Sequence, residues 1–164
     1  MKQDIYNTIS AISEGIYKEK GSKFLSFAYP IDNEEDVHSV LKDLKKRFYD
    51  ARHYCYGFII GADKSIYRAG DDGEPPNSAG PPILGQIRSK NLSNVLVVVV
   101  RYFGGTKLGV PLLINAYKTA AEDALKNALV IEKTVDSTLC VSFEYIEMDK
   151  IMKIVKDENL KITH

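Results

Sequence analysis

The stretch that decides the fold runs from Asn94 to Tyr117 and reads NVLVVVVRYFGGTKLGVPLLINAY. It opens with six consecutive apolar, mostly β-branched residues, Val95–Val100, a pattern typical of a strand that is buried on both faces. A Gly104–Gly105 break follows, and the residues after Gly109 have helical periodicity. The stretch therefore predicts a buried strand, a glycine turn and a helix, which the rest of the chain must cover.

The glycine turn has two interpretations. The backbone N–H groups of Gly104 and Gly105, with Lys107 beside them, could bind a phosphate or another anion. Alternatively, the glycines supply only the positive φ that a tight strand-to-helix turn needs. The spacing GGxKxG is neither a Walker A motif nor a dinucleotide fingerprint, so the spacing by itself favours the plain turn.

The composition is that of an ordinary globular protein. Of the 164 residues, 45% are hydrophobic and 27% are charged, which suits one domain or one domain with part of another. The formal net charge is zero, so the overall basic excess of a non-specific DNA-binding protein is absent. The two cysteines, Cys55 and Cys140, form no CxxC motif, which excludes a disulfide scaffold and argues against a zinc site. With no signal-peptide pattern and no apolar run of about 18 residues, we expect a cytoplasmic protein without a membrane partner.

Periodicity along the rest of the chain predicts a mixture of strands and helices. Asp32, with Glu35 three residues later, resembles a capping box at the start of an amphipathic helix. A composition shift at residues 130–137 suggests a domain boundary, with one domain at 1–130 and the start of a second at 131–164. The expected strands are 5–17, 23–31, 54–60, 65–69 and 139–145, the first two as an antiparallel hairpin, and the expected helices are 37–48, 83–89, 111–128 and 148–155.

An acidic loop lies at residues 70–85, GDDGEPPNSAGPPILG. Its carboxylates Asp71, Asp72 and Glu74 could hold Mg²⁺ or act as general acid and base. They could equally belong to a plain turn, or one of Asp71 and Asp72 could pair with Arg101 at the end of the central strand. The sequence favours the turn or the ion pair.

Arg52 and His53 precede a strand that is rich in aromatic residues. Alternation puts Tyr54 and its neighbours at 56 and 58 on one side, and His53 with Cys55 on the other. The aromatic side could stack single-stranded RNA bases. A His53–Cys55 nucleophile pair is disfavoured, because we expect Cys55 to be buried and a buried thiol is usually inert.

Three motifs in this order and spacing resemble the IMPACT/YigZ family over roughly residues 5–128. They are DARHYC (Asp50–Cys55), GDDGEPPNSAGPPIL (Gly70–Leu84) and VVVRYFGGTKLG (Val98–Gly109). The resemblance implies an α+β fold like the second domain of ribosomal protein S5, a four-stranded sheet with helices on one face. In bacterial members a ferredoxin-like domain follows, and residues 134–164 resemble only its opening βα unit.

The resemblance also implies a function. Eukaryotic members are translation regulators that do no chemistry, so we expect a non-enzymatic, translation-linked binding protein that has a protein or RNA partner and no cofactor. The alternatives are a metal-assisted phosphoryl or phosphodiester hydrolase that uses the acidic loop, and an RNA-binding module. Nine positions carry over from the family's motifs as the binding surface, and we call them the motif residues: Arg52, His53, Asp71, Asp72, Glu74, Arg101, Gly104, Gly105 and Lys107.

The chain departs from the family pattern at two places. Asn77–Ser78 stand where the family has Gly-Thr, and Pro111–Leu112 stand where it has Gly-Gly. Pro111 removes one N–H group from the start of the helix. Any anion site is therefore expected at Gly104–Gly105, before the proline.

Overall fold

The predicted central strand is β6 (Val95–Tyr102), and it is the middle strand of a five-stranded sheet in the computed structural model, which describes residues 4–163. All six side chains of Val95–Val100 are fully buried, which confirms the prediction. The strand order is β2-β3-β6-β4-β5, and every neighbouring pair is antiparallel. The other four strands are β2 (Ser13–Glu19), β3 (Ser22–Pro30), β4 (His53–Ile60) and β5 (Ile66–Gly70).

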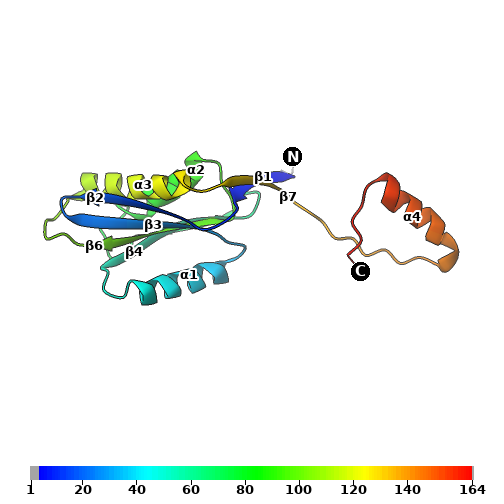
Figure 1. Cartoon of the computed structure of the whole chain (residues 1–164), viewed down its shortest axis with the longest axis horizontal. Coiled ribbons are helices and arrows are strands. Elements are labelled where there is room, and N and C mark those ends of the chain that lie inside the picture. The colour runs from blue at the N-terminus through cyan, green and yellow to red at the C-terminus, as the bar shows by residue number, and fades with distance from the viewer. Residues whose placement is uncertain (1–3, 164) are drawn as a thin grey trace.

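Helices cover both faces of this sheet (Figure 1). α2 (Gly80–Ser89) and α3 (Val110–Lys126) pack on one face, and α1 (Glu34–Arg47) packs on the other. The expectation of four strands with helices on one face is therefore wrong. The reason lies in β6, whose apolar side chains point alternately to the two faces, so that each face needs its own cover.

The single strand expected at 5–17 is two strands in different sheets. β1 (Ile5–Ile9) pairs with β7 (Val130–Thr134) in a separate antiparallel ribbon, and the chain then bends before β2 begins. The predicted hairpin is confirmed for β2 and β3. Its turn at Lys20 and Gly21 has positive φ at both residues, 45° and 82°.

The capping box of α1 is displaced by one residue from its predicted position. Asn33, not Asp32, is the N-cap, and its side chain accepts a hydrogen bond of 3.0 Å from the Asp36 N–H. The Asp36 carboxylate accepts hydrogen bonds in return from the N–H groups of Asn33 and Asp32. In α3, Pro111 lies in the first turn, as the sequence predicts, and Asn127 is the C-cap.

The C-terminal segment differs from its prediction. The strand expected at 139–145 is not formed, and a short 3₁₀ helix, η1 (Tyr145–Glu147), leads into α4 (Met148–Asp157). No residue from 135 to 163 is buried, and Figure 1 shows α4 apart from the sheet. A strand needs hydrogen-bonding partners for its backbone, and residues 139–145 pair with no other strand.

Within residues 4–163, no helix combines the length and the apolar character that crossing a membrane requires.

Candidate functional site

The three sequence motifs meet at one end of the sheet. The antiparallel register of β4 and β6 pairs His53 with Arg101, and the Arg52 N–H donates to the Arg101 carbonyl oxygen at 3.0 Å. The acidic loop follows β5 and returns to β4, where the Asp72 carboxylate accepts a 2.7 Å hydrogen bond from the Tyr54 N–H. Strand register therefore brings together segments that lie far apart in the sequence.

A buried carboxylate lies at the centre of this site. Glu74 is only 8% exposed, and its Oε1 accepts hydrogen bonds from Arg101 Nη1 at 2.5 Å and from the Tyr117 hydroxyl at 2.7 Å. Both partners are buried as well. This network connects the acidic loop, the end of β6 and the middle of α3.

The expected ion pair of Arg101 with Asp71 or Asp72 is wrong, because Glu74 is the partner. The loop makes a tight turn in which the Glu74 N–H donates to the Asp71 carbonyl oxygen at 3.0 Å. Asp72 and Gly73 have positive φ within that turn, 43° and 84°. As a result Glu74 is buried, while Asp72 remains exposed.

Arg101 is enclosed by the hairpin as well as by the loop. Its guanidinium lies over the ring of Phe24 at 5.5 Å, and its Nη2 lies 3.5 Å from the Ser22 hydroxyl oxygen. The same Ser22 oxygen accepts a hydrogen bond of 3.2 Å from the Gly104 N–H. A Cβ on Gly104 would lie 2.0 Å from the carbonyl carbon of Gly21, so residue 104 must be glycine for the hairpin to approach.

These contacts bear on the two interpretations of the glycine turn. The N–H of Gly104 already donates to Ser22, which favours the tight turn at this residue. Gly105 has φ of 87°, is exposed, and would have open space around an added Cβ. Lys107 is exposed two residues later.

Asp71 caps the N-terminus of α2. Its Oδ1 accepts hydrogen bonds from the N–H groups of Ala79 at 3.1 Å and Gly80 at 2.8 Å, and its Oδ2 accepts from Asn77 at 2.9 Å. The N-cap residue Ala79 has no side-chain acceptor of its own. In the part of the chain that the structure describes, no three His, Cys, Asp or Glu side chains gather as a metal-binding group.

His53 and Cys55 both contact the backbone of the acidic loop. His53 Nδ1 lies 2.7 Å from the Asp72 carbonyl oxygen, and because that oxygen can only accept, Nδ1 carries the proton. His53 Nε2 faces the Glu74 carboxylate at 3.7 Å. Cys55 is fully buried, and its thiol donates to the Asp71 carbonyl oxygen at 3.0 Å.

Burial raises the pKa of the Cys55 thiol far above its ordinary value, and it raises the pKa of the Tyr117 phenol in the same way. Neither group is ionised near neutral pH. The expectation that Cys55 is buried is confirmed, and it rules against this thiol as a nucleophile.

The aromatic side of β4 faces α1 rather than solvent. Phe58 is 2% exposed, and the Tyr54 hydroxyl donates to the Phe48 carbonyl oxygen at 2.5 Å. Tyr54 and Tyr56 are half-buried against the same cluster. The burial of Phe58 argues against the suggestion that this strand stacks RNA bases, because its rings do not form a free row.

Sequence reasoning missed two members of the site, Tyr117 and Ser22. Tyr117 is fully buried among the apolar residues of α3. The available signal was its hydroxyl, since a buried tyrosine usually has a hydrogen-bond partner. Ser22 follows the hairpin turn, and nothing local indicates that its oxygen contacts both Arg101 and Gly104.

Comparison with known proteins assigns the family. The model of the Impact N-terminal domain matches residues 20–125, which include all nine motif residues. The chain belongs to the IMPACT family. The IMPACT family member YvyE of Bacillus subtilis is 32% identical over 146 residues, which are 89% of this chain and 67% of YvyE. YigZ of Escherichia coli is 31% identical over 80% of this chain and 66% of its own length.

Other similarities extend to eukaryotes and to a solved structure. The protein IMPACT homolog of Saccharomyces cerevisiae is 33% identical over 66% of this chain and 43% of its own length. A crystal structure of a hypothetical protein superimposes with a TM-score of 0.78 at 26% identity, covering 94% of this chain and 76% of that one. The chain thus spans about two thirds of the length of YvyE and YigZ.

Proposed function

We propose that this IMPACT family chain is a non-enzymatic binding protein with a translation-linked regulatory role. The exposed motif residues would contact a protein or RNA partner, and the buried ones would hold them in place. The exposed set carries both charge signs and consists of Arg52, Asp72, Gly104, Gly105 and Lys107.

The buried Glu74–Arg101–Tyr117 network is the observation that supports this proposal. It connects the acidic loop to β6 and α3, so that the loop bearing Asp72 has little freedom to move. A pre-ordered surface loses less conformational entropy when a partner binds. Charged side chains on such a support can distinguish one partner from another.

The hydrogen bonds of the carboxylates support binding over catalysis. Asp71 uses both oxygens to accept backbone N–H groups, and Glu74 accepts from Arg101 and Tyr117. A general acid or base has to reach a proton on its substrate, which these side chains cannot do without breaking the network. The Cys55 thiol is buried and protonated, so it does not serve as a nucleophile.

The link to translation rests on the family. Eukaryotic members of the family, which the motifs of this chain resemble, are translation regulators. The chain is 33% identical to a yeast IMPACT homolog over 113 residues. The region of the family model, residues 20–125, contains every residue of the proposed contact surface.

The test is a quantitative pull-down from a bacterial lysate with the Arg52→Ala/Lys107→Ala variant beside the wild type. Both side chains are exposed, so the variant is expected to remain folded, and its thermal unfolding is measured first. We expect translation components to bind the wild type and to be depleted several-fold in the variant.

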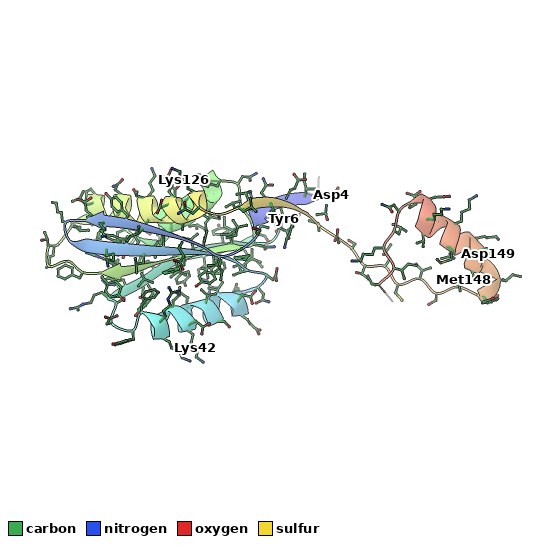
Figure 2. All side chains as sticks on the ribbon, viewed as in Figure 1. Asp4, Tyr6, Lys42, Lys126, Met148 and Asp149 are labelled. Carbon is green, nitrogen blue, oxygen red and sulfur yellow. The ribbon has the colours of Figure 1, made fainter. Side chains whose placement is uncertain are left out.

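The matched control is Lys42→Ala/Lys126→Ala, which removes the same charge from exposed positions on α1 and α3 (Figure 2). It should bind the same proteins as the wild type. If the Arg52/Lys107 variant is folded and still retains every wild-type partner, the proposed contact surface is wrong.

A further inference from the structure

The tip of the β2–β3 hairpin is a cluster of lysines without ion-pair partners. Lys18, Lys20 and Lys23, which we call the hairpin lysines, are all exposed. No ion pair among the described residues involves any of them. Glu19 is the one carboxylate between residues 18 and 23, and it accepts a hydrogen bond of 2.7 Å from the Tyr17 hydroxyl. The tip is therefore locally cationic in a chain whose formal net charge is zero.

Strand register makes this arrangement unfavourable for the free protein. Lys18 lies directly opposite Lys23 in the antiparallel pair, so both side chains project from the same face of the hairpin. Glu19 alternates to the other face and does not lie between the two ammonium groups. Like charges at opposite positions of a strand pair are destabilising, and a bound anion relieves their repulsion.

An exposed aromatic ring lies next to the hairpin tip. Phe103 is 46% exposed, and it precedes Gly104, whose backbone packs on Gly21 at the hairpin turn. The Arg101 guanidinium lies 5.8 Å from the centre of the Phe103 ring, so the buried network helps to hold the ring in place. Lys107 follows in the same turn and is exposed. Cations that alternate with an exposed ring are typical of surfaces that bind single-stranded nucleic acid.

The carboxylates at this end of the sheet lie on the β4 side. Asp72 accepts a hydrogen bond from the Tyr54 N–H of β4, and Asp50, which precedes β4, accepts one of 2.9 Å from the Tyr102 hydroxyl. In the strand order β6 separates β4 from β3. The hairpin half of the surface is therefore cationic, and the β4 half carries the acids.

The hairpin tip and β7 lie at opposite ends of the sheet (Figure 1). Lys23 pairs with Tyr102, the last residue of β6. The N–H of Ser93, two residues before β6 begins, donates to Asn7 of β1, the strand that pairs with β7. The chain that follows β7 thus leaves from the far end, and the surface at the hairpin tip includes none of residues 135–163.

We propose that the hairpin lysines, Lys107 and Phe103 bind single-stranded RNA. The lysines contact phosphates, and Phe103 stacks on a base. A single strand supplies both a repeated negative charge and flat rings, whereas an acidic protein segment supplies only the charge. This inference rests on the proposed function and deepens it, because it assigns RNA to the cationic half of a surface whose partner is there a protein or an RNA.

The test is fluorescence anisotropy of the purified whole chain with a labelled oligouridine of about 20 nucleotides, which is longer than the site of one small domain. The dissociation constant is measured between about 50 and 300 mM salt. Each phosphate contact on a single strand contributes about 0.7 to the slope of its logarithm against the logarithm of the salt concentration. Four lysines should therefore give a slope of about 3.

The Lys18→Ala/Lys20→Ala/Lys23→Ala variant removes the hairpin charge. It should raise the dissociation constant about tenfold at the lowest salt and lower the slope by about 2. Its melting temperature should equal or exceed that of the wild type, because the repulsion between residues 18 and 23 is gone. Loss of binding in a variant that is no less stable separates a binding role from a structural one.

The matched control is Lys90→Ala/Lys118→Ala/Lys126→Ala, which removes the same charge from exposed positions at the end of α2 and along α3. It should bind oligouridine within about twofold of the wild type at 150 mM salt, where distant surface charges are screened.

Phe103→Leu separates stacking from charge. Leucine keeps an apolar side chain beside the Arg101 guanidinium but has no π-face. The dissociation constant should therefore rise roughly tenfold, while the salt slope stays at the wild-type value.

The proposal is overturned if oligouridine does not bind, if the hairpin variant and its control weaken binding equally, or if Phe103→Leu leaves the affinity unchanged. Polyglutamate that competes as well as unlabelled oligouridine would assign the surface to an acidic protein instead, and tighter binding of oligodeoxythymidine would assign it to DNA. If RNA binding fails while the Arg52/Lys107 pull-down still loses translation components, the proposed function stands with a protein partner. If RNA binding depends on the hairpin lysines while that pull-down is unchanged, only the contact surface of the proposed function is wrong.

Discussion

At the scale of single residues, Glu74 and Arg101 are two buried charges, and each is stable in the core only because it is paired with the other. Each side chain is at most 8% exposed, and the Tyr117 hydroxyl satisfies the same carboxylate oxygen. A buried ion pair contributes little net stability relative to apolar residues, but removing one partner leaves the other charge without compensation. The pair therefore resists substitution at either position.

Replacing Arg101 with methionine is expected to lower the free energy of unfolding by about 3–5 kcal/mol, because Glu74 is left buried and unpaired. Urea unfolding followed by circular dichroism measures the loss. The Arg101→Met/Glu74→Leu variant should recover part of it, since neither charge remains. A loss below about 1 kcal/mol for the single variant would contradict the buried pair.

At the scale of secondary structure, α2 depends on a residue outside itself. Its N-cap is Ala79, whose side chain cannot accept a hydrogen bond. The carboxylate of Asp71, nine positions before Gly80, accepts the hydrogen bonds of the Ala79 and Gly80 N–H groups instead. Three backbone N–H groups donate to this one side chain. Asp71 thus fixes both the start of the helix and the path of the acidic loop.

Asp71→Ala is expected to lower the stability by about 2 kcal/mol, the upper range for loss of a helix cap. Hydrogen exchange observed by NMR should show faster exchange at the amides of Ala79 and Gly80. The matched control is Asp72→Ala, which removes a neighbouring carboxylate and should expose only the Tyr54 amide. Unchanged protection at residues 79 and 80 in the Asp71 variant would show that this cap does not hold α2.

At the scale of the whole molecule, the sheet and its three helices form the part with a core, and α4 contributes no buried residue to it. β7 belongs with the sheet side, because it pairs with β1 and the Val135 N–H donates to the Asp4 carbonyl oxygen at 2.8 Å. The division into domains at 1–130 and 131–164 stays a prediction, and we propose that the second unit begins after this ribbon.

A chain that ends at residue 137 is expected to melt at the same temperature as the full chain, because the removed segment buries nothing in the core. A chain that ends at residue 129 loses β7, the partner strand of β1, and it should melt roughly 5 °C lower. Differential scanning calorimetry makes the comparison. A lower melting temperature for the 137-residue chain would mean that α4 docks on the sheet.

Sequence patterns by themselves determined the elements whose signals are local. The β-branched run predicted the buried strand β6, and the apolar stripe after Gly109 predicted α3 with Pro111 in its first turn. The three motifs predicted the family. The motifs also predicted that residues near 52, 71–74 and 101–107 form one binding surface. They did not predict which of these side chains are in contact. The predictions of β6 and α3 succeed because burial period and turn chemistry act over a few residues.

Tertiary structure alone decided the number of strands, the use of both faces of the sheet, and the partner of Arg101. Residues 74 and 101 are 27 positions apart, and residues 22 and 104 are 82 apart. Their contacts depend on strand register and on the turn at Asp72–Gly73, which makes Glu74, rather than either aspartate, the buried acid. Local patterns specify the conformation of a short segment. Which of the three neighbouring carboxylates pairs with Arg101 depends instead on where the folded chain places the Arg101 guanidinium.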